Sequence, residues 1–497
     1  MTGTYDLLVI GGGVNGAGIA RDAAGRGLTV LLCEKGDLAQ GTSSRSGKLV
    51  HGGLRYLEYF EFRLVREALL EREVLLGIAP HIIWPMRFVL PHSRDQRPAW
   101  MIRLGLFFYD HLGGRQKLPG ARRLDLRTAP EGAAIKPAFR TAFEYSDCWV
   151  DDARLVVLNA LDAEKRGAEV RLHTQAVSAR RENGLWRVTL ASDDGGKQDV
   201  SARALVNAAG PWVERVIRQV IGASSTRRVR LVKGSHLIVR KFWEGRQAYL
   251  LQNDDKRVIF VNPYDGEFCL IGTTDVPYEG DADDVRVSEA EREYLLRAVN
   301  RYARHQLAPT DILHEYSGVR PLYDDRARNP SAVTRDYVFD IGTDAGQTPE
   351  LSIFGGKITT YRKLAEHALG KLAPFFPHLK KAWTARAPLP GGDIPGGDFG
   401  AYLATVRREY PWLPAAIAAH YARHYGTRVA ELLEGARSLQ ALGRHFGALL
   451  YEREADFLRR TEWARSAEDV LERRTKHYLR LRPEEISAFA AWMGHAQ

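Results

Sequence analysis

A glycine motif between two apolar runs constrains this chain more than any other feature. Apolar residues dominate positions 5–10 and 29–33, and the second run is followed directly by Glu34. Between the runs lies a GxGxxG motif made of Gly11, Gly13 and Gly16. A strand, a glycine turn and a small-residue helix over 15–26 predict a βαβ unit. In such a unit the first glycine permits a tight turn, the second allows a pyrophosphate to approach the backbone, and the third allows the helix to pack on the strand. The acid accepts hydrogen bonds from the ribose hydroxyls, and the helix N-terminus attracts the phosphates. The N-terminus is therefore predicted to bind a dinucleotide.

Beyond this unit the pattern continues as a mixture of helices and strands. Apolar residues recur at helical spacing over 58–76 and 151–166, and a further helix is predicted over 359–372. Strand patterns occur at 169–177, 185–190, 204–206 and 351–354. The stretch 228–272 is strand-rich and predicts a largely antiparallel sheet. From residue 399 onward, abundant Ala, Leu, Arg and Glu favour helices.

These patterns predict an α/β fold (α+β over the whole chain) with three domains. A discontinuous, Rossmann-like dinucleotide-binding domain is expected over 1–86, 148–227 and 331–387. A substrate domain built on an antiparallel sheet is expected over 87–147 and 228–330, and a helical domain over 388–497. Prolines within 87–147 predict a loop-rich insertion, and the Pro- and Gly-rich stretch 388–397 predicts a flexible linker. Catalysis is expected between the first two domains.

Composition narrows the function classes only in part. The net charge of +10 suits an acidic partner such as a phosphorylated substrate, an anionic membrane or a nucleic acid. Basic residues are interleaved with acids, and no Lys/Arg stripe alternates with aromatics, which argues against nucleic-acid binding. The three cysteines stand apart without CxxC spacing, so they are expected to be reduced, and no metal site is predicted. No signal peptide or membrane-spanning run is predicted.

Several longer segments resemble the FAD-dependent aerobic glycerol-3-phosphate dehydrogenases, within the D-amino-acid-oxidase-like flavoproteins. They are 42–56 (TSSRSGKLVHGGLRY), 206–212 (VNAAGPW), 272–275 (GTTD), 316–321 (YSGVRP) and 354–361 (FGGKITTY), in the order of that family. One departure is Gly47, where family members commonly carry a second serine. The resemblance implies FAD as cofactor, oxidation of glycerol 3-phosphate to dihydroxyacetone phosphate, and electron transfer to ubiquinone or menaquinone. It also implies peripheral attachment to the cytoplasmic side of the inner membrane, and it admits a homodimer.

The same segments supply the candidate cofactor site. A hydroxyl-rich loop ending in a lysine offers neutral donors and one cation to an anionic cofactor. The glycine pair before the helix at 359 provides a second helix N-terminus, which stabilises negative charge on a reduced flavin. The predicted cofactor-binding residues are Gly11, Gly13, Asn15, Gly16, Glu34, Thr42, Ser43, Ser44, Ser46, Lys48, Val177, Gly210, Trp212, Gly356, Lys357 and Thr359.

A phosphorylated substrate calls for convergent cations on loops near strand ends. Arg55, Arg320 and Lys357 are the candidates, with Tyr56 beside the first. Oxidation of an alcohol also needs a base for the hydroxyl proton, and His51 suits this role by its ordinary pKa. Alternatively, Arg320 binds the hydroxyl and stabilises a developing alkoxide, which leaves either His51 or water as the base. The predicted catalytic residues are His51, Arg320 and Lys357.

Two alternatives stay open at the level of sequence. The segment 100–109 (WMIRLGLFFY) puts Trp100, Leu104, Phe107 and Phe108 on one helical face with basic residues nearby, at 94, 97, 115 and 117. It is interpreted either as an interfacial membrane contact or, preferably, as a core helix of the substrate domain. The electron acceptor is likewise open between quinone and oxygen, the latter making the protein a glycerol-phosphate oxidase that produces hydrogen peroxide.

Overall fold

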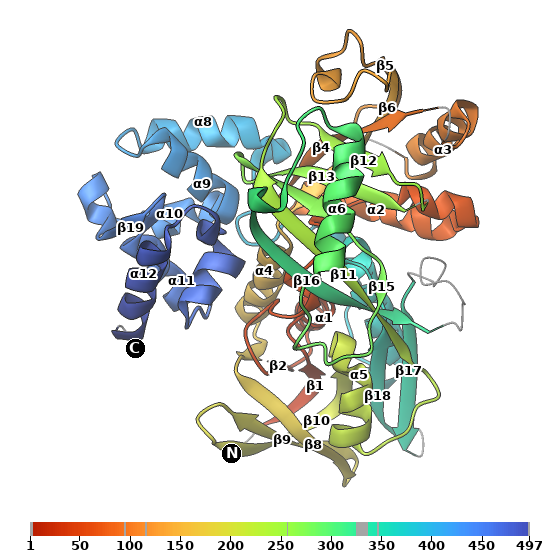
Figure 1. The fold of residues 1–497 in the computed structure, drawn as a ribbon. Coiled ribbons are helices and arrows are strands. Elements are labelled where there is room, and N and C mark those ends of the chain that lie inside the picture. The colour runs from red at the N-terminus through yellow and green to blue at the C-terminus, as the bar shows by residue number, and fades with distance from the viewer. Residues whose placement is uncertain are drawn as a thin grey trace.

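A computed structural model describes residues 3–93, 96–114, 117–255, 257–324, 336–344 and 347–495. Its first sheet is mainly parallel and runs β17-β18-β10-β1-β2-β7, with the β8–β9 hairpin extending from β10. The strands are β1 (Thr4–Ile10), β2 (Val30–Cys33), β7 (Glu169–Arg171), β8 (Thr174–Glu182), β9 (Leu185–Ser192), β10 (Lys197–Asn207), β17 (Val338–Asp344) and β18 (Gln347–Phe354). Figure 1 shows this sheet in the lower half of the molecule.

Three helices cover one face of the first sheet. They are α1 (Val14–Gly25), α4 (Asp152–Lys165) and α7 (Tyr361–Leu372). Leu7 and Val9 of β1 pack in one core with Ile19 of α1 and Leu364 of α7. Such continuous burial is typical of a parallel strand covered on both faces. The predicted helices over 15–26, 151–166 and 359–372 are thereby confirmed to within a few residues.

The second sheet is mostly antiparallel and runs β15-β11-β14-β13-β12-β4-β6-β3, with β16 beside β11 and β5 beside β6. Its strands are β3 (Leu49–Val50), β4 (Ile83–His92), β5 (Arg122–Asp125), β6 (Thr141–Val150), β11 (Val229–Arg240), β12 (Ala248–Gln252), β13 (Val258–Tyr264), β14 (Phe268–Gly272), β15 (Val276–Pro277) and β16 (Ile312–Tyr323). Successive residues of a strand face opposite sides of the sheet. Leu237 and Val239 of β11 pack beneath α6 (Glu289–Tyr302), so the neighbouring positions His236 and Ile238 face the other side.

The predicted loop-rich insertion over 87–147 is only partly correct. Strands β4 and β6 pair antiparallel along ten residues each, and α3 (Ala99–Leu112) lies between them in sequence. Pro91 stands within β4 opposite Ala142. At Pro91, long-range pairing with β6 overrides the local signal for a loop, because proline is tolerated where the ladder needs no N–H donor. Pro98, Pro119 and Pro137 lie outside the strands and helices, as predicted.

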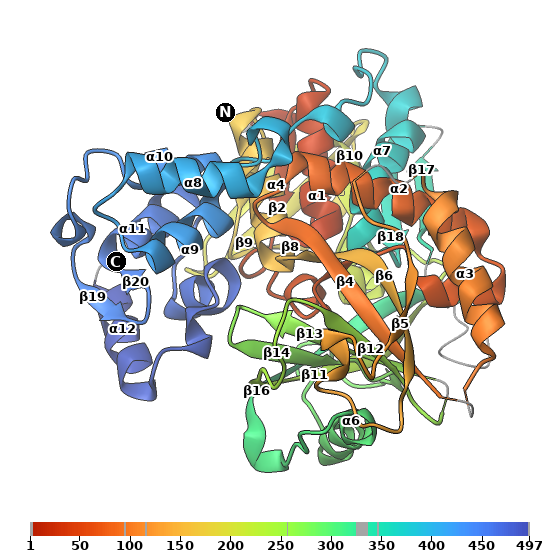
Figure 2. The same cartoon turned by 90° about the horizontal axis from the view of Figure 1, so that it is seen from above.

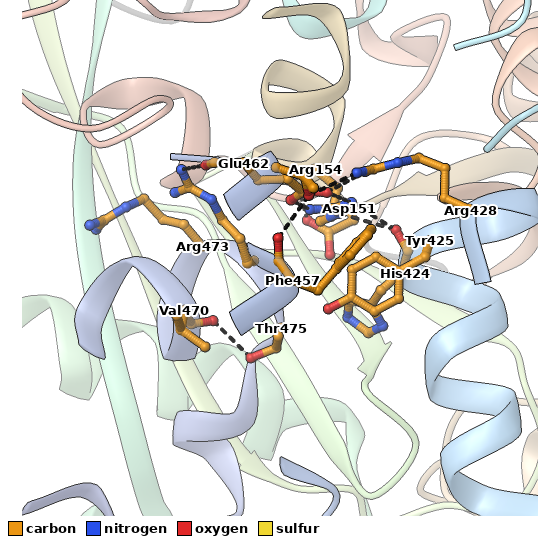
Figure 3. Close-up of polar contacts among 12 residues, drawn as sticks. Asp151, Arg154, His424, Tyr425, Arg428, Phe457, Glu462, Val470, Arg473 and Thr475 are labelled. Carbon is orange, nitrogen blue, oxygen red and sulfur yellow. Dashed lines mark hydrogen bonds and ion pairs between the residues drawn. The ribbon is translucent and has the colours of Figure 1, made fainter. Parts of the chain in front are cut away.

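The helical C-terminal domain has its own core and lies to one side of both sheets (Figures 1 and 2). Its elements are α8 (Phe399–Glu409), α9 (Ala415–Tyr425), α10 (Val429–Leu432), α11 (Glu452–Thr461), α12 (Pro483–His495) and the small hairpin β19 (His445–Gly447) and β20 (Leu450–Tyr451). Figure 3 shows how it docks: Arg154 of α4 reaches Glu462, which also binds Arg428. This confirms the predicted helical domain.

The stretch before this domain is packed, which corrects the expected flexible linker. Leu389 is buried and its N–H donates to the carbonyl of Ile78 at 2.8 Å. A Cβ on Gly392 would lie 2.2 Å from that same carbonyl oxygen. The glycines at 391 and 392 therefore serve close backbone approach instead of flexibility.

The domain boundaries of the sequence analysis stay predictions. Strand β3 and the first residues of β4 belong to the second sheet, although residues 1–86 were predicted to be part of the dinucleotide-binding domain. The boundary at 330/331 lies outside the described residues. Within the residues that are described, no helix is long and apolar enough to cross a membrane.

Candidate active site

A cavity of about 1740 Å³ lies between the two sheets. Its walls come from the β1–α1 turn, the loop after β2, the turn after β18 and the face of the second sheet that carries His236. A pocket for a small ligand has roughly 300–1,000 Å³, so this cavity has room for a dinucleotide together with a small substrate.

The glycine turn shapes one end of the cavity. Gly11 has φ of 110°, and its N–H donates to the carbonyl of Cys33 at 2.8 Å. A Cβ on Gly16 would lie 1.9 Å from the carbonyl oxygen of Gly11, so only glycine lets α1 pack this close. Gly13 is the N-cap residue of α1 and has no side chain to cap it. The N-terminus of α1 therefore opens toward the cavity, as a pyrophosphate requires.

Glu34 stands at the end of β2 beside this turn. Its carboxylate accepts hydrogen bonds from the N–H of Gly12 at 2.6 Å and of Gly36 at 2.9 Å. Burial raises the pKa of Glu34, and the two N–H donors counter that shift. These bonds hold the carboxylate at the cavity wall, in the position that a ribose-binding acid needs.

The hydroxyl-rich loop contributes only part of what was predicted. Thr42, Ser43 and Ser46 line the cavity, and Ser43 accepts from the N–H of Val14 at 3.0 Å. Lys48 is buried behind the wall, where its ammonium lies 2.8 Å from Asp152. Its charge is therefore neutralised inside the fold, and the structure does not bring it to the cavity as expected. Ser44 also lies outside the lining.

The second helix N-terminus is formed as predicted from the segment after β18. Gly355 and Gly356 have φ of 82° and 112°, and a 3₁₀ turn at Ile358–Thr360 leads into α7. Asn15 of α1 donates to the carbonyl of Gly355 at 3.4 Å. Asn15, Gly356, Lys357 and Thr359 all line the cavity, joining segments that lie some 340 residues apart.

The remaining predicted cofactor residues divide between the wall and its support. Gly210 and Trp212 line the cavity, and the Lys35 ammonium lies 4.1 Å from the centre of a Trp212 ring. Val177 is not part of the lining, although Gln175 and Ala176 before it are. Gly16 acts through packing against Gly11, as described above.

His51 is partly buried in the cavity wall. Its backbone N–H donates to the Thr359 hydroxyl at 3.2 Å, and its ring meets the edge of Phe260 at a centroid distance of 6.2 Å. Burial, with the nearby charges of Lys357 and Arg72, lowers the pKa of His51 to about 4. The imidazole is therefore neutral near pH 7 and able to accept a proton.

Three cations face the same cavity with different surroundings. Among the described residues Arg55 has no acidic partner, and its Nε is buried without a hydrogen bond. The Lys357 ammonium lies 3.9 Å from the centre of the Tyr56 ring. Arg320 is held by Asp275 at 2.5 Å and by the Thr273 hydroxyl at 2.9 Å. Arg55 is thus the cation whose charge the fold leaves most available to an anion.

Sequence reasoning missed several wall residues of the second sheet. His236 and Asn262 face the cavity from β11 and β13, and Phe260 contacts His51. Thr273 and Asp275 were recognised as part of a motif but not as the partners of Arg320. A lone polar residue within an apolar strand is the signal that could have marked His236 and Asn262, because a buried polar group needs a polar neighbour or a ligand.

Comparison with known proteins agrees with this geometry. Residues 6–362 match the family model described as FAD dependent oxidoreductase, and residues 382–489 match the C-terminal domain of alpha-glycerophosphate oxidase. The chain is 61% identical to D-erythritol 1-phosphate dehydrogenase of Brucella abortus, over 99% of this chain and 98% of that one. It is 53% identical to aerobic glycerol-3-phosphate dehydrogenase of Escherichia coli, over 99% and 97%.

Solved structures give the same answer for the fold. The glycerol-3-phosphate dehydrogenase from Bacillus halodurans, complexed with FAD, superposes with a TM-score of 0.78 at 27% identity, covering 99% of this chain and 90% of that one. The predicted fold class and the predicted FAD cofactor are confirmed. This chain therefore belongs to the FAD-dependent oxidoreductases, among relatives that include the glycerol-3-phosphate dehydrogenases.

Proposed function

We propose that this protein oxidises sn-glycerol 3-phosphate to dihydroxyacetone phosphate and passes the electrons to a membrane quinone. One observation carries the substrate assignment: the Arg55 guanidinium, without an acidic partner among the described residues, faces the same cavity as Lys357 and His51. Two cations beside a neutral imidazole suit a phosphate next to an alcohol. Relatives 56% and 53% identical over nearly the whole chain are named glycerol-3-phosphate dehydrogenase, which supports the same substrate.

The residues divide the chemistry between them. Arg55, Tyr56 and Lys357 bind the phosphate and fix the substrate in the cavity. His51 takes the hydroxyl proton while the carbinol hydrogen leaves as a hydride with both electrons, so that the C–O bond becomes a carbonyl. Arg320, oriented by Asp275, stabilises the negative charge that develops on that oxygen. Bound FAD supplies the hydride acceptor.

The first experiment is anaerobic mixing of the FAD-loaded protein with glycerol 3-phosphate. We expect the flavin absorbance at ~450 nm to decrease, because hydride transfer from the substrate reduces the flavin. If the flavin absorbance did not decrease, the substrate assignment would be wrong. Addition of a quinone analogue or of oxygen then distinguishes the acceptors. Fast reoxidation by quinone supports the dehydrogenase, whereas fast reoxidation by oxygen with peroxide formation supports an oxidase.

An apolar surface supports the quinone acceptor. Helix α3 buries Leu106 and Tyr109 but leaves Trp100 65% and Phe107 57% exposed, which contradicts the preferred interpretation as a core helix. Phe60, 80% exposed, lies at the end of the neighbouring 3₁₀ turn Leu54–Tyr59. Figures 1 and 2 both place α3 on the side of the molecule opposite the C-terminal domain. Of the basic residues predicted nearby, those at positions 94 and 115 lie outside the described residues.

This surface is continuous with the cavity, because Trp100, Leu104 and Phe108 also line it. An apolar quinone could therefore reach the cavity from a bilayer that the α3 face touches. We expect the protein to bind the cytoplasmic side of the inner membrane through this face. Sedimentation with vesicles of phosphatidylglycerol and phosphatidylethanolamine tests it. The double variant Trp100→Ser, Phe107→Ser should bind several-fold less, and binding equal to the wild type would contradict the assignment.

A second substrate is favoured by the relative that is 61% identical, which is named D-erythritol 1-phosphate dehydrogenase. The roles above apply equally to a longer polyol phosphate. Anaerobic mixing with D-erythritol 1-phosphate, beside glycerol 3-phosphate, decides between them by the second-order rate constants of flavin reduction.

A further inference from the structure

The wall of the cavity contains buried polar groups that the proposed reaction does not use. His236 is 2% exposed and Asn262 is 1% exposed, and both line the cavity. Among the described residues, both ring nitrogens of His236 and Oδ1 of Asn262 have no hydrogen-bond partner. Buried polar groups are almost always paired, because leaving them unpaired is costly. Three such atoms at one place indicate a polar ligand.

The two residues are brought together by strand register. His236 of β11 lies opposite Gly272 of β14, which in turn lies opposite Phe260 of β13, two residues before Asn262. A Cβ on Gly272 would be 2.1 Å from the His236 ring, so glycine makes room for the imidazole. On its other side, His236 stacks on Tyr316 of β16 at a centroid distance of 4.8 Å. The ring is therefore held in place by its neighbours.

Gly47 borders the same two residues. Its carbonyl accepts from Nδ2 of Asn262 at 3.4 Å, and a Cβ at this position would lie 3.6 Å from Nε2 of His236. Gly47 does not have a positive φ, so its backbone does not require glycine. A serine at this position would bring its hydroxyl toward the imidazole. Glycine leaves that space and that hydrogen-bonding capacity to a ligand.

The chemistry of the groups favours a hydroxyl over a second phosphate, because the two nearby cations, Arg320 and Lys48, are already paired with Asp275 and Asp152. Burial and the charges of Arg320 and Lys48 lower the pKa of His236 well below its ordinary value, so the ring is neutral. A neutral imidazole offers one donor and one acceptor, and the Asn262 amide oxygen adds a second acceptor. That set complements a hydroxyl group, which donates once and accepts, whereas a phosphate would require cations.

The position relative to the reacting centre indicates which hydroxyl this is. Phe260, which contacts His51, shares its sheet face with His236 and Asn262, and Arg320 stands on the same face of the neighbouring strand β16. A polyol phosphate held by its phosphate at Arg55 and by its carbinol at His51 and Arg320 extends its remaining carbons along this face. Glycerol 3-phosphate has one carbon beyond the carbinol, and a tetritol phosphate has two.

We propose that Gly47, His236 and Asn262 form a hydroxyl-binding subsite that admits polyol phosphates one carbon longer than glycerol 3-phosphate. The proposal rests on the proposed function, because it assumes that a polyol phosphate is oxidised in this cavity. It assigns chain-length specificity to three residues, of which Gly47 provides the space and the other two provide the hydrogen bonds.

The test uses the FAD-loaded full-length protein and the variants Gly47→Ser and Asn262→Leu. Flavin reduction is followed anaerobically with D-erythritol 1-phosphate and with glycerol 3-phosphate. In each variant we expect the ratio of the two second-order rate constants, tetritol over triol, to fall by about tenfold or more, because a site built to bind a hydroxyl discriminates strongly. Gly77→Ser is the matched control: it lies on the exposed face of α2 (Phe62–Ile78), where a Cβ meets nothing within 4 Å.

Binding provides a readout that does not depend on turnover. The dithionite-reduced protein cannot accept a hydride, so calorimetric titration with each polyol phosphate measures affinity alone. We expect Gly47→Ser to weaken binding of the tetritol phosphate by about tenfold or more and to leave glycerol 3-phosphate within about twofold.

Three results would overturn the subsite. They are an unchanged ratio in both variants (which includes an equal loss for both substrates), a changed flavin content or visible spectrum in the variants, and a wild type that is reduced by glycerol 3-phosphate but not by the tetritol phosphate. The last leaves the proposed function intact. Reduction by the tetritol phosphate alone would instead overturn the proposed substrate and support the subsite, so the two failures are distinguishable.

Discussion

Arg154 of α4 and Glu462 after α11 form an ion pair whose two side chains are both fully buried (Figure 3). The pair joins the dinucleotide-binding part of the chain to the C-terminal domain, and Arg428 binds the same carboxylate. Removing one partner leaves an uncompensated buried charge, which typically costs about 3–5 kcal/mol. We expect Glu462→Gln to lower the free energy of unfolding by that amount in urea titrations. Glu182→Gln, in an exposed pair with Arg180, should cost less than about 1 kcal/mol.

The same pair predicts how stability depends on pH. Arg154 and Arg428 hold the pKa of Glu462 down to about 2 in spite of its burial. Because the folded pKa lies below the unfolded value of about 4.5, the stabilisation is complete above that unfolded value and is lost as pH falls toward 2. We expect the stability difference between wild type and Glu462→Gln to shrink between about pH 4.5 and pH 2. A difference that stays constant over this range would show that the carboxylate is not held ionised by its arginines.

Arg55 is expected to bind the substrate phosphate. Arg55→Met removes charge-assisted hydrogen bonds worth about 1.5–3 kcal/mol each, so the second-order rate constant of flavin reduction by the substrate should fall by roughly 100-fold. FAD content should not change. Arg66→Met, on the exposed face of α2, is the control and should behave as the wild type. A loss of flavin in place of a loss of substrate affinity would move Arg55 to the cofactor site.

His51 is expected to act as the base. Because its pKa is lowered to about 4, the imidazole is neutral throughout the physiological range, and flavin reduction should slow only as pH falls toward 4. His51→Gln should lower the limiting rate by roughly 10²–10⁴-fold. Lys357→Met removes a charge that lowers this pKa, so it should shift the acid limb of the wild-type profile to higher pH. If the acid limb of the pH profile did not shift in Lys357→Met, the limb would reflect the titration of a group other than His51.

Gly16 is expected to control cofactor binding through packing. Gly16→Ala places a Cβ 1.9 Å from the carbonyl oxygen of Gly11, which forces α1 away from β1 and disturbs the turn. We expect loss of bound FAD, measured by its absorbance after gel filtration, and destabilisation of about 1–3 kcal/mol. Gly77→Ala, with open space around it, should keep FAD and be as stable as the wild type or slightly more. Retention of FAD by Gly16→Ala would contradict this role.

Features that depend on local geometry were predictable from the sequence. The glycine motif with Glu34 identified the βαβ unit, because the backbone conformation of a tight turn and the packing of a helix on its strand depend on a few adjacent residues. The segments around His51, Arg55 and Lys357 were predicted to share one site, and the structure places all three on one cavity. The FAD cofactor followed from the resemblance of these segments to a known family, and the fold class from the pattern of helices and strands.

Features that depend on long-range partners were not predictable. Lys48 was expected to contact the cofactor, but in the structure it forms an ion pair with Asp152. The two residues are 104 positions apart, so the local sequence around Lys48 does not indicate this pair. Pro91 indicated a loop, whereas pairing between β4 and β6 makes a strand of the residues around it.

His236 and Asn262 illustrate the same limit within the site. Each lies in an ordinary strand, and only the register of β11, β14 and β13 brings them together at the cavity. The sequence alone therefore determined the cofactor-binding motif, whose turn and helix start are local, and the general class of chemistry. Tertiary structure decided which charges are neutralised and which polar groups meet in the cavity, because burial and ion pairing depend on residues that the chain brings together only when it folds.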